Sequence, residues 1–230
     1  MKDKALAFLE SNRLLHIAML EGIRKDEVEY LAAEPRGVLL RDKASGICMM
    51  SVADLDFGKK LVDDLEECYQ MVVCQEELVD YIQKRYGYTD IFSCKKAVYF
   101  KKEKPVLNTE LDIKEPDAEY LQKIKDVYHT IPEEEVDEIH RRGNLFCAFY
   151  QGEFVGYAGN HLDGSLGLLE IFEPYQGKGF GEQLEIFMMH HIMDKGDIPY
   201  GEIVLGNEPS IKLQEKLGFE LSKEVITWLL

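Results

Sequence analysis

The residues with the clearest chemical potential are the three glycines of Gln176-Gly177-Lys178-Gly179-Phe180-Gly181. Glycine adopts positive φ at no steric cost, so such a run can curl tightly and aim several backbone N–H groups at one point. The preceding residues 166–172 are short and apolar, which predicts a strand, and Leu184, Met188 and Ile192 recur downstream at helical spacing. The run therefore stands at a strand-to-helix turn, where unpaired N–H groups and the helix dipole favour an anion such as a pyrophosphate.

Two other glycine motifs fit this run poorly. A P-loop requires a hydroxyl residue after its lysine, whereas Lys178 is followed by Gly179. A dinucleotide fingerprint requires G-x-G-x-x-G, whereas the spacing here is G-x-G-x-G. A further interpretation stays open, in which the glycines form only a tight structural turn.

Two segments of the chain resemble the motifs of the GNAT superfamily of acyl-CoA-dependent N-acyltransferases. Gln176, Gly179 and Gly181 fill the fixed positions of the pattern Arg/Gln-x-x-Gly-x-Gly/Ala, and a strand followed by a proline precedes them. Residues 207–219 resemble the second pattern, N-x-x-A/S-x-x-L-Y-x-K-x-G-F. The resemblance covers residues 105–230.

The resemblance implies an α+β fold with a mixed, mostly antiparallel central sheet flanked by helices. It also implies acetyl-CoA as the co-substrate. The amides of residues 177–181, helped by Lys178, would hold the pyrophosphate, and a backbone N–H of strand 169–172 would polarise the thioester carbonyl. Asn207 would meet the pantetheine arm or fix the start of the following helix. The full predicted cofactor-binding set is Leu169, Ile171, Phe172, Gln176, Gly177, Lys178, Gly179, Phe180, Gly181, Asn207, Ser210 and Gln214.

The usual acid and base of the family are both replaced in this sequence. Gln214 stands where the tyrosine acid is expected, and Ser165 stands where the glutamate base is expected. An amide can hydrogen-bond a leaving thiolate but cannot protonate it. We therefore expect three catalytic contributors: the Ile171 amide as oxyanion donor, Gln214 beside the thiolate, and Glu170 as a substitute base shielded from water. Transfer by positioning and a water relay alone is an alternative. Second choices for the base are His161 and Glu173.

The distribution of charged residues limits the kinds of binding partner that we expect. Residues 1–104 carry 17 Lys and Arg against 19 Asp and Glu, whereas residues 105–230 carry 10 against 24. Such an acidic half repels a phosphate backbone, so we expect no nucleic acid partner. It suits a cationic amine, although an acidic surface that only aids solubility is an equal alternative.

Apolar runs, cysteines and histidines lead to expectations about membranes, compartment and metals. No run approaches the length of about 18 apolar residues that a membrane span requires, so no membrane partner is expected. The five cysteines include no C-x-x-C pair, which predicts free thiols in a reducing, cytoplasmic compartment. Adjacent His190 and His191 diverge on a helix, so no metal site is expected.

A faint internal repeat predicts two related domains. Hairpin-like pairs occur at 37–52 and 144–158, and an offset of 131 places Met71–Cys74 on Glu202–Leu205. We therefore predict a degenerate GNAT-like domain without a cofactor site over residues 1–104 and a GNAT domain over 105–230. Phe57-Gly58-Lys59-Lys60 would replace the pyrophosphate loop, and the alternative is an unrelated first domain.

In the second half, residues 111–113 read as a strand and Leu121, Ile124 and Val127 as one face of a helix. The polar stretch 132–142 reads as an exposed second helix or as a border of the acceptor site.

The leading hypothesis is an N-acetyltransferase that moves an acetyl group from acetyl-CoA to a primary amine of a small cationic acceptor. The amine would attack directly in a ternary complex, within a monomer or a homodimer. Two alternatives stay open. One is an acyl-CoA-binding GNAT module without efficient transfer. The other is an N-acyltransferase that uses a larger acyl-CoA, similar to the glycine N-acyltransferases.

Overall fold

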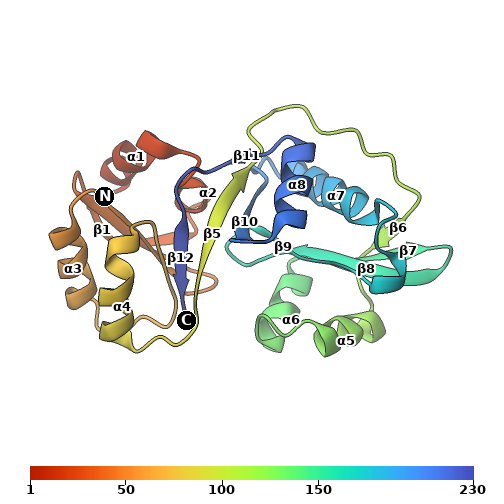
Figure 1. The fold of residues 1–230 in the computed structure, drawn as a ribbon, viewed down its shortest axis with the longest axis horizontal. Helices are drawn as coiled ribbons and strands as arrows, with labels where there is room; N and C mark the ends of the chain where they lie inside the picture. Colours follow the sequence, from red (N-terminus) through yellow and green to blue (C-terminus); the bar gives the residue numbers. More distant parts are fainter. The chain divides into compact units, whose positions relative to one another are not determined.

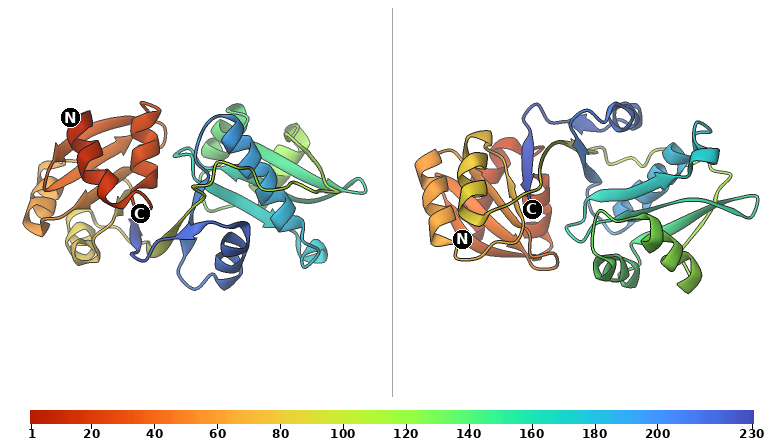
Figure 2. Two further views of the ribbon diagram at one scale, coloured as in Figure 1. Left: turned by 90° about the horizontal axis from the view of Figure 1, so that it is seen from above. Right: turned by 60° about the horizontal axis from the view of Figure 1, so that its bottom comes forward.

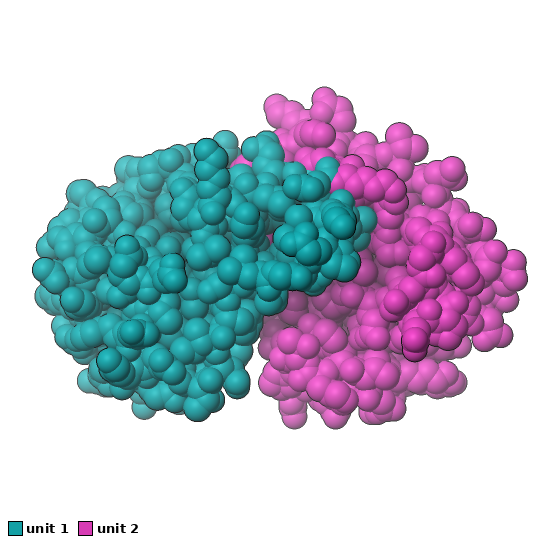
Figure 3. All heavy atoms as spheres, viewed as in Figure 1, with its two compact units in different colours: residues 1–98, 202–215, 219–230 teal, residues 99–201, 216–218 magenta.

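A computed structural model describes residues 1–230 and divides into two compact units (Figure 3). The first unit contains Met1–Val98, Glu202–Glu215 and Phe219–Leu230, and the second contains Tyr99–Gly201 and Lys216–Gly218. The domain boundary predicted at residue 104 separates two repeated halves of the sequence, which differ from these compact units, and it stays a prediction. No helix combines the length and the apolar character that crossing a membrane requires.

The first unit is a sheet with helices on both faces. Its strands run in the order β1-β2-β3-β4-β12-β5-β10, and β3 and β4 are parallel. The short β11 pairs antiparallel with β5. The strands are β1 (Val28–Glu34), β2 (Gly37–Asp42), β3 (Cys48–Val52), β4 (Met71–Val73), β5 (Ile91–Val98), β11 (Glu220–Leu221) and β12 (Ile226–Leu229). The helices are α1 (Lys2–Leu9), α2 (Ile17–Arg24), α3 (Leu55–Asp64), α4 (Val79–Tyr86) and α8 (Glu208–Leu217), with 3-10 turns at Glu10–Asn12 and Glu76–Leu78.

The C-terminal strand completes the first unit. β12 lies between β4 and β5, antiparallel to both, with Thr227 opposite Val73 on one side and Ser93 on the other. The backbone of Leu230 exchanges hydrogen bonds with Asp90. A strand in this position supplies two ladders of backbone hydrogen bonds, so the last residues of the chain hold the two parts of this sheet together. Figure 1 shows β12 and the C-terminus in blue, beside β5.

A buried core lies between the sheet of the first unit and helices α3 and α4. In α3, Phe57 and Leu61 are four residues apart, and with the adjacent Val62 they pack in one buried cluster with Met50 and Leu78. That spacing places them on one side of the helix, which explains why α3 forms at this face of the sheet.

The second unit has the same layered design. Its strands run in the order β10-β9-β8-β7-β6, and all pairs except β9–β10 are antiparallel. Helix α7 covers one face and helices α5 and α6 cover the other (Figures 1 and 2). The strands are β6 (Asp112–Lys114), β7 (Leu145–Tyr150), β8 (Glu153–Asn160), β9 (Leu166–Ile171) and β10 (Tyr200–Val204), and the helices are α5 (Ala118–Val127), α6 (Glu133–Arg141) and α7 (Phe180–Asp194), with a 3-10 turn at Glu173–Tyr175.

Local chemistry explains these elements. Asp117 begins α5, because its side chain accepts hydrogen bonds from the first free N–H groups of the helix. Phe180, Leu184 and Met188 lie on the sheet-facing side of α7 and are fully or almost fully buried. The mixed, mostly antiparallel α+β fold expected from the sequence is confirmed, as are the strand at 111–113 and the second helix at 132–142.

The two halves of the chain repeat one succession of elements. Two helices, three antiparallel strands, a helix, a parallel strand and a helix appear as α1 to α4 and again as α5 to α8. The offset that places β4 on β10 is confirmed, since each follows the corresponding helix and pairs parallel with the strand before it. The expected match between hairpins 37–52 and 144–158 is wrong by one strand, because β2–β3 corresponds to β8–β9.

Candidate functional site

An extra residue bends strand β9 at its centre. Leu168 has φ 47°, a left-handed conformation that a leucine rarely adopts. Across this point the register shifts, because Tyr157 and Gly159 of β8 oppose Glu170 and Gly167 of β9. β9 therefore contributes one residue more than β8, which defines a β-bulge, and bulges turn a strand away from its neighbours.

On its other side β9 separates from β10 almost at once. β10 pairs with β9 at a single position, where Gly201 lies opposite Leu166. After this pair β9 runs on through the bulge, and Leu169 and Glu170 are exposed. The bulge and the short pairing together leave the second half of β9 with one unpaired edge.

The Ile171 amide points at that unpaired edge. The Phe172 N–H donates to the Val155 carbonyl on β8 at an N–O distance of 3.0 Å. Successive N–H groups of a strand point in opposite directions, so the N–H and C=O of Ile171 face away from β8. The Ile171 carbonyl on this edge accepts a hydrogen bond from the Gln176 side chain at 2.8 Å. The amide that was predicted to be the oxyanion donor therefore faces the unpaired edge of β9.

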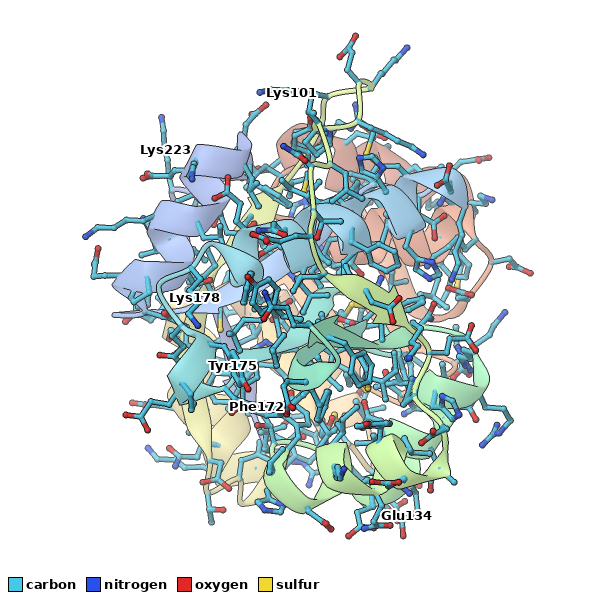
Figure 4. The ribbon with its side chains drawn as sticks, turned by 90° about the vertical axis from the view of Figure 1, so that its right-hand side faces the viewer. Lys101, Glu134, Phe172, Tyr175, Lys178 and Lys223 are labelled. Atoms are coloured by element: carbon cyan, nitrogen blue, oxygen red, sulfur yellow. The ribbon has the colours of Figure 1, made fainter.

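The glycine loop, residues Gln176–Gly181, leads from β9 into α7 and leaves its backbone accessible. Gly177 and Gly179 have φ 74° and 81°, and a Cβ added to either would meet no atom within 4 Å. Lys178 is exposed, with its Nζ 5.2 Å from the Tyr175 ring centroid. Figure 4 shows Phe172, Tyr175 and Lys178 following one another along the segment between β9 and α7.

The first turn of α7 is left uncapped, in contrast to the corresponding helix of the first unit. Gly179 occupies the N-cap position of α7 and offers no side chain to the free N–H groups. In α3, by comparison, the Asp54 carboxylate accepts from the amides of Asp56 and Phe57 at 3.0 and 3.1 Å. A carboxylate thus fills the anion position of α3, while that of α7 stays open to an external anion.

This contrast corrects one sequence prediction. Residues 57–60 were expected to replace the pyrophosphate loop of the first half, but they lie inside α3. The connection from β3 to α3 consists of Ala53 and Asp54 alone. At the start of α3 the loop is therefore short, and its aspartate caps the helix.

Glu170, the predicted substitute base, has a partner that sequence reasoning missed. The Tyr157 hydroxyl donates to the Glu170 carboxylate at 2.5 Å, across a register pair of β8 and β9. The Tyr157 side chain is fully buried, and burial together with this carboxylate raises its pKa, so it stays a hydrogen-bond donor. The expected shielding of Glu170 is wrong, since the bulged edge of β9 leaves it exposed.

The loop between β8 and β9 accounts for Ser165 and His161. Ser165 donates from its hydroxyl at 2.7 Å and from its amide at 3.0 Å to the Asp163 carboxylate, which closes the turn. Tyr200 fixes the same turn by donating to the Asp163 carbonyl at 2.5 Å. Glu135 of α6 lies near these groups; burial and the Asp163 charge raise its pKa, and His161 opposes that shift. Glu173 is exposed in the 3-10 turn after β9.

The remaining predicted residues lie on α8 or in the core. The Asn207 side chain accepts from the Ser210 amide at 3.2 Å and so fixes the start of α8, one of its two expected roles. Gln214 is buried on the same helix, and these three residues belong to the first unit. The Phe180 side chain packs in the core against Tyr150, so only its backbone can serve a cofactor.

The bulged β9, its divergence from β10 and the glycine loop before α7 are together the features expected of a GNAT fold. Solved structures agree. The chain is similar to a Drosophila protein (16% identity, TM-score 0.67, covering 99% of this chain and 94% of that one). It is also similar to a GCN5-related N-acetyltransferase-like protein from Streptococcus suis (17%, 0.57, 98% and 99%) and to a GCN5-related N-acetyltransferase from Kribbella flavida (12%, 0.56, 94% and 94%).

Part of the chain also matches a family model. Residues 149–229 match the model described as FR47-like protein, which spans β8 to β12 and includes the glycine loop. Among curated proteins there is no match. The chain has the GNAT fold that its two motifs predicted, and the structural matches that cover nearly its full length are consistent with the two-domain form.

Proposed function

We propose that this protein is an N-acetyltransferase that takes acetyl-CoA as donor and a primary amine of a small cationic molecule as acceptor. The observation that carries the proposal is the open N-terminus of α7 beside the unpaired edge of β9. An anion binder and an oxyanion donor then lie at the two ends of one short connection, residues 172–179.

The residues present fit an acyl-CoA. Gly177 and Gly179 leave space for a pyrophosphate against the backbone, because no atom occupies the positions where their side chains would be. Lys178 would add a positive charge. Acetyl-CoA, when bound, supplies an activated acetyl thioester; everything else in the reaction depends on groups of the protein.

Three of those groups have a role in the chemistry. The Ile171 N–H would hydrogen-bond the carbonyl oxygen as negative charge develops on it, a contribution of about 3 kcal/mol in comparable sites. Glu170 would accept the proton of the attacking amine, and Tyr157 would hold the carboxylate in one orientation. The oxyanion donor Ile171 and the base Glu170 are adjacent residues of β9, so the same strand positions both.

A cationic acceptor is supported by charge. Glu170, Glu135 and Asp163 contribute carboxylates from β9, α6 and the β8–β9 loop, and residues 105–230 carry a large acidic excess. Such a field attracts cations and raises their association rate, most strongly at low ionic strength.

The test is turnover with a panel of mono-, di- and polyamines and acetyl-CoA, read as acetylated product by mass spectrometry. Glu170→Gln preserves the size of the side chain and the contact to Tyr157 but removes the base. We expect it to lower kcat by about a hundredfold with little change in acetyl-CoA affinity. Equal kcat in wild type and Glu170→Gln would remove Glu170 from the mechanism.

Two other functions remain distinguishable from this one. The loss of both usual acid–base residues, at Gln214 and Ser165, favours a module that binds acyl-CoA without transfer. It predicts tight acetyl-CoA binding and no product with any amine. A larger-acyl transferase predicts higher kcat/KM with benzoyl-CoA than with acetyl-CoA.

A further inference from the structure

Two of the five cysteines lie together at one end of the first unit, far along the chain from the glycine loop. Cys48 begins β3 and is fully buried, and Cys68 lies in the connection between α3 and β4 with 9% of its surface exposed. Both belong to the same hydrophobic core cluster. They do not form a disulfide in this structure.

A single carbonyl oxygen fixes both cysteines. The Cys48 amide donates to the Gln70 carbonyl at 3.0 Å, and the Cys68 thiol donates to the same oxygen at 3.2 Å. The two residues are therefore neighbours around one oxygen atom, and each thiol shifts the pKa of the other. The remaining thiols, Cys74, Cys94 and Cys147, have no such thiol neighbour among their interactions.

A cation stands beside the pair. Arg41 of β2 lies opposite Cys48 in the sheet register and extends to the Glu67 carbonyl at 3.5 Å, next to Cys68, so its positive charge is close to both thiols. The neighbouring Cys68 side chain lowers the pKa of Cys48 to about 7 against the opposing effect of burial, and Arg41 contributes further. The same interaction raises the pKa of Cys68. One sulfur is therefore favoured as a thiolate and the other as a thiol.

We propose that Cys48 and Cys68 are a redox pair that closes to an intramolecular disulfide in the presence of a peroxide. The Cys48 thiolate attacks one peroxide oxygen, the O–O bond breaks, and a sulfenic acid and water result once a proton is taken up. The Cys68 thiol then attacks the sulfenic sulfur, the S–S bond forms, and a second water leaves. Two thiols thus give two electrons to one hydrogen peroxide, and a dithiol reductant reverses the step.

The connection that holds Cys68 provides access for the oxidant. Glu67 is exposed and Tyr69 is 83% exposed, so the flanks of Cys68 are in solvent. Residues 65–70 form no helix or strand, and side chains hold three of their carbonyls: Tyr86 donates to Leu65 at 2.9 Å, Arg41 to Glu67 at 3.5 Å and Tyr88 to Cys68 at 2.6 Å. Local opening of residues 65–70 would admit a small peroxide without unfolding the sheet.

The experiment treats the full-length protein with graded hydrogen peroxide, blocks remaining thiols with N-ethylmaleimide under denaturing conditions, and maps the peptides without reduction. Digestion with trypsin and chymotrypsin is needed, because Tyr69 then separates Cys68 from Cys74. We expect a mass loss of two hydrogen atoms, three blocked thiols in place of five, and one linked peptide pair containing Cys48 and Cys68. A linkage through any other cysteine, a disulfide between chains, or five blocked thiols at every peroxide dose would overturn the proposal.

Two variants sharpen this result. Cys74→Ser removes a nearby thiol outside the pair and is expected to leave the linkage intact, whereas Cys68→Ser is expected to abolish it and leave four blocked thiols or an oxidised Cys48. Arg41→Gln is expected to slow closure several-fold at constant peroxide, since it removes the cation that stabilises the thiolate. Unchanged closure in Cys68→Ser would contradict the pairing, and the mapping of the wild type stands even if a variant folds poorly.

Discussion

A substitution at Gly179 separates the backbone role of this glycine from its role in binding. Gly179 has φ 81° and Gly196, just beyond the other end of α7, has φ 79°; a side chain at either position meets no atom within 4 Å. Aspartate at either position therefore carries the same left-handed backbone cost of about 1 kcal/mol, and Asp tolerates that conformation better than most residues. The two variants should lose similar stability.

Only the variant at Gly179 should lose acyl-CoA. A carboxylate about 5 Å from a pyrophosphate charge costs about 3 kcal/mol at an effective dielectric constant of about 20, which is more than a hundredfold in Kd. Gly179→Asn carries the same bulk without the charge, so it should lose clearly less affinity than Gly179→Asp. Calorimetric titration with acetyl-CoA gives the three affinities, and thermal unfolding gives the matched stabilities. Wild-type affinity in Gly179→Asp, or an equal loss in Gly196→Asp, would refute the assignment of the anion site.

Three further predictions follow from single contacts. Tyr157→Phe should lower kcat about tenfold with acetyl-CoA affinity unchanged and stability altered by about 1 kcal/mol, which steady-state kinetics and calorimetry measure. Burial lowers the pKa of His16 in the folded state below its ordinary value of 6.5. The contribution of His16 to the free energy of unfolding is therefore complete above pH 6.5 and declines as the pH falls from there towards the folded pKa. Denaturant titrations should show this decline in the wild type and a shallower decline in His16→Gln. Removal of residues 226–230 takes β12 out of the first sheet, so a protease should degrade Met1–Val98 faster in the truncated chain than in the intact chain.

The glycine loop was predictable because its backbone demands a particular residue. Gly177 and Gly179 occupy positive φ, and an apolar strand and an amphipathic helix flank them, so three kinds of evidence agreed in one short window. Motif resemblance then added the Ile171 amide, and the direction of that amide follows from the β8–β9 ladder. Local patterns of this kind survive folding because they are satisfied locally.

Features that depend on contacts between distant parts of the chain could not be predicted from local sequence patterns. The bulge at Leu168 places a leucine in a conformation that no sequence pattern favours, and it exposes Glu170, which was expected to be shielded. The Tyr157 contact depends on a register that the bulge itself resets. β12 joins strands more than a hundred residues away in sequence, and four residues without a hairpin partner give no hint of that position. The Asp54 cap is a local feature, but the loop predicted at residues 57–60 lies a few residues beyond it.

The central claim is that the open N-terminus of α7 and the free edge of β9 bind an acyl-CoA. Calorimetric titration of the wild-type protein with acetyl-CoA, coenzyme A and benzoyl-CoA tests it most directly. We expect acetyl-CoA to bind at one site per chain with a micromolar Kd. Coenzyme A should bind with most of that affinity, because the pyrophosphate supplies the main anchor. Absence of binding by all three would contradict the account and leave the fold without the activity.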